Sequence, residues 1–171
     1  MFLVRTARLE DAEQLPDIER SAARSFLDIP DLAWIASDEV QSSEQHRQLI
    51  AGGGAWVAET SYGEIVAFLN GETWDQTFHI CEVSVSQPVQ GQGLGRTLMQ
   101  AAIDQARREG LEAVTLTTFR QVRWNEPFYM SLGFRTLAAH ELTGRLAAVL
   151  EAEVRSGLPR EARCAMTLDL F

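Results

Sequence analysis

The stretch Glu82-Val-Ser-Val-Ser-Gln-Pro-Val-Gln-Gly-Gln-Gly-Leu-Gly-Arg96 joins two runs of different character. The residues around its start, 78–85, are rich in β-branched and aromatic side chains, which favours a strand. After it, apolar residues recur three or four positions apart over residues 98–106, which predicts one apolar face of a helix. The sequence therefore predicts a strand, a glycine-rich turn and a helix in direct succession.

This turn has the features of an anion-binding site. The first N–H groups of a helix have no intrahelical acceptor, and the helix dipole favours negative charge there. Gly91, Gly93 and Gly95 allow a phosphate to approach the backbone because they carry no Cβ. A plain structural turn is the alternative, but such a turn rarely needs three alternate glycines. We therefore interpret the turn as an anion-binding site.

The composition narrows the chemistry that this turn can serve. All fifteen basic residues are arginine, and 24 acidic residues give a formal net charge of −9. Without lysine, a P-loop and Schiff-base catalysis are excluded, and the acidic balance argues against a nucleic-acid partner. The G-x-G-x-G spacing also departs from the G-x-G-x-x-G of dinucleotide-binding folds. Backbone amides must therefore hold the anion.

The length of 171 residues predicts one domain over residues 1–171. No run approaches the roughly 18 apolar residues of a membrane span, and we expect no signal peptide. These features predict a cytoplasmic protein without a membrane partner. Two cysteines and three scattered histidines give neither a disulfide framework nor zinc-ligand spacing, so we expect no metal site.

Helical and β-type runs alternate along the chain, which predicts a mixed α/β fold. Before residue 25, the apolar spacing predicts a helix with Asp11 as its N-cap, although Pro16 lies late for a first turn. We expect the next segment, 25–37, to be irregular. The other expected helices cover residues 38–50, 125–130, 141–156 and the run from the glycine turn to Gly110; the expected strands cover residues 2–6, 55–60, 65–70, 78–85, 113–119, 162–170 and a run from residue 134.

Two motifs resemble those of a known family. The turn sequence Gln90-x-x-Gly93-x-Gly95 resembles the R/Q-x-x-G-x-G/A motif with which the GCN5-related N-acetyltransferases (GNAT family) bind the diphosphate of acetyl-CoA. A second block, Trp124-Asn-Glu-Pro-Phe-Tyr129-Met-Ser-Leu-Gly-Phe134, matches the family's Asn, Tyr and Gly-Phe positions. The second block follows the turn across one expected strand, and this placement makes the pair of motifs specific.

The resemblance implies a fold and a co-substrate. The fold is a single domain with a central, mostly antiparallel sheet that is splayed at the CoA site and flanked by helices. The co-substrate is acetyl-CoA, whose pantetheine arm would bind the backbone of Val83 and Val85 as an added strand does. A local loop difference is expected at Gln87-Pro88, where the family more often places its Pro one position earlier. The other implied CoA-binding positions are Gln90, Gly91, Gln92, Gly93, Leu94, Gly95, Arg96 and Asn125.

Acetyl transfer to an amine needs a base, because a free alkyl amine with a pKa of about 10.4 is protonated at neutral pH. Glu82 is the expected base, since a carboxylate is unusual in an apolar strand. His79 is its rival, and a bulge between the two could bring both to one cleft. By the resemblance, the Val83 N–H stabilises the thioester oxygen and Tyr129 protonates the leaving thiolate. A packing role in the core is the alternative for Tyr129.

We therefore expect an acetyl-CoA-dependent N-acetyltransferase that acts on a primary amine by direct attack in a ternary complex. A catalytically silent acyl-CoA-binding regulatory module on the same fold is the alternative. The acceptor is a small-molecule amine or a protein amine, and the resemblance would place residues 25–37, with Trp34, over its pocket. The resemblance also implies that the chain could pair as a homodimer.

Overall fold

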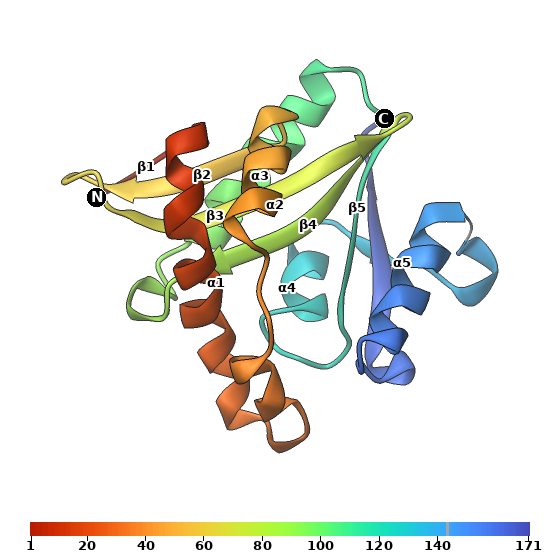
Figure 1. Cartoon of the computed structure of the whole chain (residues 1–171). Coiled ribbons are helices and arrows are strands. Elements are labelled where there is room, and N and C mark those ends of the chain that lie inside the picture. Colours follow the sequence, from red (N-terminus) through yellow and green to blue (C-terminus); the bar gives the residue numbers. More distant parts are fainter. Residues whose placement is uncertain (143) are drawn as a thin grey trace. The chain divides into compact units, whose positions relative to one another are not determined.

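Strands and helices alternate along the chain in the computed structural model, which describes residues 1–142 and 144–171 (Figure 1). The strands are β1 (Phe2–Thr6), β2 (Ala55–Thr60), β3 (Ile65–Trp74), β4 (Thr77–Val85), β5 (Ala113–Phe119), β6 (Arg135–Thr136) and β7 (Arg163–Asp169). The α-helices are α1 (Leu15–Ala23), α2 (Ser43–Ala51), α3 (Leu94–Arg108), α4 (Glu126–Ser131) and α5 (Gly144–Arg155). The 3-10 helices are η1 (Leu9–Gln14), η2 (Arg24–Asp28), η3 (Pro30–Ser37), η4 (Gln87–Val89), η5 (Ala139–Glu141) and η6 (Arg160–Ala162).

The strands form a mixed sheet in the order β1-β2-β3-β4-β5-β7-β6. The pairs β1–β2, β2–β3, β5–β7 and β6–β7 are antiparallel. β4 and β5 are parallel, with a register that runs from Thr77↔Ala113 to His79↔Thr115. The expected mixed α/β fold with a mostly antiparallel sheet and flanking helices is therefore confirmed.

The chain divides into two compact units, and each is described here by itself. The first comprises residues 1–72 and 81–105, and the second comprises residues 73–80 and 106–171. None of the helices within the described ranges is long and apolar enough to cross a membrane.

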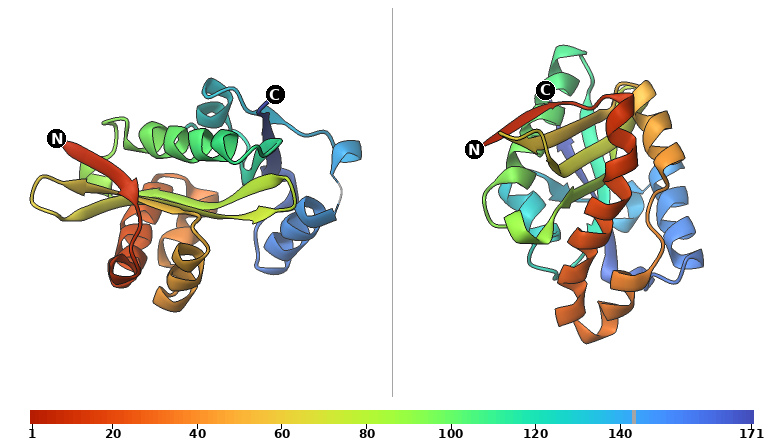
Figure 2. Two further views of the ribbon diagram at one scale, coloured as in Figure 1. Left: turned by 90° about the horizontal axis from the view of Figure 1, so that it is seen from above. Right: turned by 60° about the vertical axis from the view of Figure 1, so that its left-hand side comes forward.

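In the first unit, α1 and α2 lie on one face of the strands and α3 lies on the other (Figure 2). The apolar residues of α1 recur three or four positions apart and therefore share one face of the helix. This apolar stripe packs on the strands. Leu15 and Ile18 join Val57, Ile65 and Phe68 in one core cluster, and none of the five is more than 5% exposed. This packing determines which side chains of α1 face the strands.

The second unit is built on the antiparallel pair β5–β7, with α5 packed against it. Leu150 of α5 forms a core cluster with Leu137 and Ala165. Beside this cluster, the Arg163 guanidinium donates to both carboxylate oxygens of Glu153, at 2.9 and 3.0 Å. These contacts tie α5 to β7.

The first helix begins later than its apolar spacing predicts. A 3-10 turn, η1, comes first, and α1 begins at Leu15, so that Pro16 lies in the first turn, where its missing N–H costs no hydrogen bond. Asp11 is not the N-cap of α1. It accepts the backbone N–H of Arg8 at 2.7 Å and two guanidinium N–H groups of Arg5 at 2.8 and 3.1 Å. Asp11 therefore fixes β1 to η1.

Two segments before β2 also differ from the expectation. Residues 25–37 are not irregular but form most of η2 and all of η3. The following helix begins at Ser43 and not near residue 38, because Ser42 and Gln45 form a capping box there. A polar cap outweighs the weak apolar pattern of the preceding residues.

Towards the C-terminus, the expected helix over residues 141–156 corresponds to α5, and Thr143 lies outside the described residues. The strand expected from residue 134 is the two-residue β6. β3 is longer than expected and continues to Trp74.

One histidine of the first unit is completely buried. His46 of α2 is 0% exposed, its Nδ1 lies 3.2 Å from Nδ2 of Asn70, and its ring meets Phe68 edge-on with the centroids 4.9 Å apart. Burial lowers the pKa of His46 to about 4. The unfolded chain binds this proton near the ordinary value of about 6.5, so acid favours the unfolded state.

Substituting His46→Gln should remove this pH dependence. In the wild type, the free energy of unfolding should fall as the pH drops from about 6.5 towards 4, by up to about 3 kcal/mol from this group. The variant should be less stable at neutral pH, because it loses the packing on Phe68, but should respond less to acid. Urea unfolding across this pH range measures both effects. His140→Gln, at an exposed histidine, is the control and should keep the wild-type slope; an equally steep slope in His46→Gln would contradict the assignment.

Candidate functional site

The turn between β4 and α3 contains two residues in the left-handed conformation. Gly91 has φ +80° and Gly93 has φ +82°, a region that L side chains rarely adopt. A Cβ built on either glycine meets no heavy atom within 4 Å. Conformation therefore requires these glycines, and the turn presents an open face. Gly95 differs, because it already lies in the first turn of α3.

Peptide N–H groups at the start of α3 directly follow this turn in the chain. Both the backbone N–H and the hydroxyl of Thr97 donate to the carbonyl of Gly93, at 3.0 Å each. The amides of Gly93, Leu94 and Gly95 precede this first intrahelical bond, in the part of a helix that binds anions. Gly91, Gln92 and Gly93 are exposed. The residues present thus fit a diphosphate.

Hydrogen bonds hold the turn against the end of β4 and against the segment around the end of α1. The Gln90 amide donates to the carbonyl of Val85 at 2.9 Å and accepts the hydroxyl of Ser25 at 3.1 Å. The backbone N–H of Gln87 donates to Oγ of Ser21 at 2.9 Å. The C-terminal end of α1 and the start of η2 therefore support the turn. Sequence reasoning expected Gln90 at the cofactor, whereas its side chain here bonds to protein atoms.

The last residues of β4 lead into this turn. Val83 and Val85 are half-buried, and Ser84 between them is buried. The Ser84 hydroxyl donates to Oε1 of Glu82 at 3.2 Å. Glu82, the two valines and the glycine turn thus belong to one continuous segment of the first unit.

Sequence reasoning missed a second carboxylate in this unit. Glu19 of α1 accepts the backbone N–H of Gln41 at 3.2 Å. Burial, followed by the charge of Glu82, raises the pKa of Glu19 to about 8. A signal was available in the sequence: Glu19 comes four residues after Leu15 and one after Ile18, which places it on the apolar stripe of the helix.

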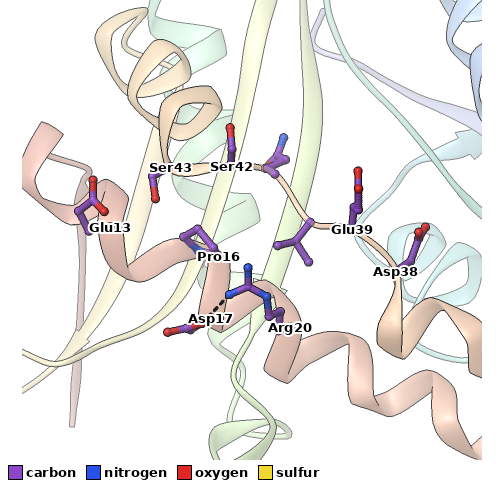
Figure 3. Close-up of a pocket in the computed structure, with 10 residues that line it drawn as sticks. Glu13, Pro16, Asp17, Arg20, Asp38, Glu39, Ser42 and Ser43 are labelled. Atoms are coloured by element: carbon purple, nitrogen blue, oxygen red, sulfur yellow. Dashed lines mark hydrogen bonds and ion pairs between the residues drawn. The ribbon is translucent and has the colours of Figure 1, made fainter.

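A surface hollow of about 630 Å³ lies between α1 and residues 38–43 (Figure 3). Its lining includes four acidic side chains: Glu13, Asp17, Asp38 and Glu39. Arg20 also lines it and pairs with Asp17 at 2.6 Å. The hollow is therefore acidic and open to solvent, and the residues that line it include none of those singled out from the sequence.

The other candidate base, His79, lies in the second unit. It is 4% exposed, and its Nδ1 lies 3.0 Å from Oγ1 of Thr115. The ring of Trp74 stacks on it with 4.0 Å between centroids and 11° between planes. These contacts give His79 a well-packed position on β4.

Tyr129 and Asn125 also lie in the second unit, on and before α4. The carbonyl of Asn125 accepts the backbone N–H of Tyr129 at 3.0 Å, and the Asn125 amide donates to the carbonyl of Trp124 at 3.0 Å. Tyr129 is buried, with Phe128 and Phe134 edge-on to its ring. The second motif thus forms the short helix that its sequence predicted.

The fold is thus a mixed α/β fold, and its glycine turn between a strand and a helix is suited to an anionic ligand. A model of the acetyltransferase (GNAT) family matches residues 16–134 of this chain, a range that contains both motifs. The chain therefore belongs to the GNAT family of acetyltransferases, which confirms the resemblance seen in the sequence.

Solved structures share this fold over nearly the whole chain. An acetyltransferase of the GNAT family from Staphylococcus aureus Mu50 is 16% identical, with 100% of both chains covered and a TM-score of 0.72. The PaiA N-acetyltransferase from Thermoplasma acidophilum, in complex with coenzyme A, is 15% identical, with 99% of both chains covered and a TM-score of 0.69. The ribosomal-protein-S18-alanine N-acetyltransferase from Escherichia coli is 16% identical, covering 99% of this chain and 94% of that one, with a TM-score of 0.68. At these identities the likeness concerns the fold.

Two glycine substitutions should show whether the turn needs glycine for its backbone conformation. Gly93→Ala should lower the free energy of unfolding by about 1 kcal/mol, because alanine is strained at φ +82°. Gly95→Ala should be neutral or stabilising by up to about 1 kcal/mol, because alanine is the better helix former. Urea unfolding of the two variants tests this, and equal stabilities would contradict the conformational explanation.

Proposed function

We propose that this chain is an acetyl-CoA-dependent N-acetyltransferase that acetylates a primary amine by direct attack in a ternary complex. The observation that carries the proposal is the β4–glycine turn–α3 segment in a member of the GNAT family. The coenzyme A complex of the Thermoplasma acidophilum relative adds support for the co-substrate.

In this proposal the amides of residues 91–95 bind the diphosphate, helped by the dipole of α3 and by the charge of Arg96. Gln92 and Leu94 contribute through their backbone, and Gln90 holds the turn in shape. The backbone of Val83 and Val85 binds the pantetheine amides as an added strand would. Asn125 is the remaining candidate contact.

The amine must be neutral before it attacks, because a protonated amine has no lone pair. Glu82 accepts that proton, directly or through water. His79 is the weaker candidate. Its Nδ1 already lies at hydrogen-bond distance from Oγ1 of Thr115, and its ring is stacked on Trp74. The N–H of Val83 donates to the thioester oxygen as negative charge develops there. Tyr129 protonates the departing thiolate.

The acceptor is proposed as a small-molecule amine or a protein amine. The name of the Escherichia coli relative gives an example of a protein acceptor for this fold. The acidic balance of the chain, at −9, fits attraction of cationic amines and equally fits ordinary solubility, so it does not select the acceptor.

Isothermal titration with acetyl-CoA, followed by a panel of amines assayed for CoA release, tests the proposed function. We expect saturable binding and release of free CoA with at least one amine. No binding at high micromolar acetyl-CoA would overturn the proposal. Binding without CoA release from any amine would favour a regulatory acyl-CoA-binding module instead. Because the chain contains no lysine, acetyl-lysine detected on a protein acceptor cannot come from the enzyme itself.

The acid role of Tyr129 can be tested against the other tyrosine of the chain. Tyr129→Phe should lower the rate of CoA release by roughly 100-fold or more, because a general acid contributes about that much, while acetyl-CoA binding stays within a few-fold. Tyr62→Phe is the matched control, since Tyr62 is 97% exposed, and should keep the wild-type rate. An unchanged rate in Tyr129→Phe would leave Tyr129 with a packing role only.

A further inference from the structure

We propose that the loop between β5 and α4, residues 120–125, binds a carboxylate of the acceptor through the guanidinium groups of Arg120 and Arg123. The inference rests on the proposed function and narrows its substrate class: the acceptor is an amine that also carries a carboxylate, as an amino acid does. Neither arginine was among the site residues expected from the sequence.

The first step is the anchoring of this loop. It follows Phe119 directly and contains Val122, and these side chains are only 4% and 6% exposed. The backbone N–H of Arg120 donates to the carbonyl of Ala162 at 2.7 Å, which continues the β5–β7 ladder by one residue. The backbone N–H of Asn125 donates to the carbonyl of Val122 at 2.9 Å and closes a turn. The loop is therefore held at both ends by the second unit.

The backbone of the loop is strained between the two arginines. Gln121 has φ +62°, in the left-handed region, where a residue with a Cβ is disfavoured. It is one of only two non-glycine residues within the described ranges that have a positive φ. Strain of this kind persists where the surrounding structure enforces it, and it occurs often in segments that hold a ligand. Gln121 thus draws attention to the arginines on either side of it.

The second step is the face on which Arg120 lies. Thr118 is opposite Cys164 in the β5–β7 register, and Sγ of Cys164 lies 3.6 Å from Oε2 of Glu126, at the start of α4. Side chains two positions apart on a strand share a face, so Arg120 lies on this same face. Burial and the charge of Glu126 raise the pKa of the Cys164 thiol to about 11, and the charge of Arg120 opposes that rise. The guanidinium is therefore near α4.

The third step is the absence of a counter-ion from the protein. Within residues 1–142 and 144–171, the side chains of Arg120 and Arg123 have neither an ion pair nor a hydrogen bond. Arg120 is nevertheless half-buried, where a cation ordinarily has a partner. The chain contains 24 acidic residues, so carboxylates are not scarce. Six other arginines do pair with them: Arg5, Arg8, Arg20, Arg47, Arg135 and Arg163.

The acidic side chain on this face already has other partners. Oε2 of Glu126 accepts the hydroxyl of Thr136 and the thiol of Cys164. In the neighbouring η6, Arg160 and Glu161 contribute charges of opposite sign and leave the local balance unchanged. Both guanidinium groups of the loop are therefore available to an anion from solution. Guanidinium groups bind carboxylates with two parallel hydrogen bonds, which gives such a site geometric selectivity.

The fourth step is the place of the loop relative to the proposed chemistry. Arg123 precedes Asn125 by two residues, and the carbonyl of Asn125 accepts the backbone N–H of Tyr129 at 3.0 Å. Four residues of α-helix span about 6 Å, so the loop ends roughly one helical turn before Tyr129. In the proposed function Tyr129 protonates the sulfur of CoA, whereas the phosphates of CoA lie beyond the pantetheine arm. An anion at this loop is therefore assigned to the acceptor.

Amines with and without a carboxylate test this inference. The panel contains α- and ω-amino acids, and each is paired with the amine that lacks the carboxylate, such as 4-aminobutyrate with butylamine. We expect kcat/KM for CoA release to be at least tenfold higher for the amino acid in one or more pairs. A kcat/KM for the plain amine that equals or exceeds that of the amino acid in every pair would overturn the inference.

Substitutions then assign the preference to the two arginines. Arg120→Gln and Arg123→Gln should each lower kcat/KM for the preferred amino acid at least tenfold, mainly through KM, and leave the plain amine within twofold. Arg155→Gln, at an exposed arginine of the same unit, is the matched control and should keep both values. A preference that survives in both loop variants, or an equal loss with both substrates, would contradict carboxylate binding by the loop.

The phosphates of CoA are the other anions that these arginines could meet. Both loop variants should bind acetyl-CoA within twofold of the wild type in titration calorimetry. Binding at least tenfold weaker in either variant, with no such loss for 3′-dephospho-acetyl-CoA, would assign the arginines to the co-substrate and overturn the inference.

These readouts separate the inference from the proposed function. If CoA is released from amines with and without a carboxylate alike, the enzyme stands and the assignment of the loop is wrong. If no amine releases CoA, the proposed function fails, and sodium butyrate titrated into the protein saturated with CoA tests the loop alone. Butyrate should then bind the wild type and Arg155→Gln equally and each loop variant at least tenfold more weakly. Absence of saturable binding to the wild type at millimolar butyrate would overturn the inference.

Discussion

A steric constraint underlies the candidate site: the chain must pass from β4 to α3 through two residues in the left-handed conformation. Only glycine adopts that conformation without a cost of about 1–2 kcal/mol per residue. Gly91 and Gly93 meet it, and a Cβ built on either glycine would lie in open space. The bracing bonds of Gln90 then hold the turn in this shape. The passage from β4 into α3 therefore depends on this one turn.

Local features could be predicted from the sequence because their causes are local. The strands over residues 55–60 and 113–119 have the expected bounds, since β-branched and aromatic side chains within them and turn residues before them set both. The first helix does not, because Asp11 bonds to Arg5 and Arg8 instead of capping it. The strand order could not be derived from local pattern, since neighbours such as β5 and β7 lie far apart in the sequence.

The same distinction applies to the candidate site. The glycine turn and the helix of Tyr129 were predicted, because a spacing of a few residues defines each. The environment of His79 could not be predicted, because Thr115 and Trp74 reach it from other strands. Glu19 was missed for a related reason. Its place on an apolar stripe is visible in the sequence, but its bond to Gln41 and its exposure to the charge of Glu82 exist only in the folded chain.

The bond between Ser25 and Gln90 connects the glycine turn to the segment that follows α1. Gln90 shapes the turn, and Ser25 follows directly after the helix that carries Glu19. Oγ of Ser21, within that helix, likewise accepts the backbone N–H of Gln87. A displacement of the helix would therefore strain two hydrogen bonds of the turn. A ligand that moved the helix would change the affinity of the turn, and a ligand of the turn would change the affinity of the helix by the same factor.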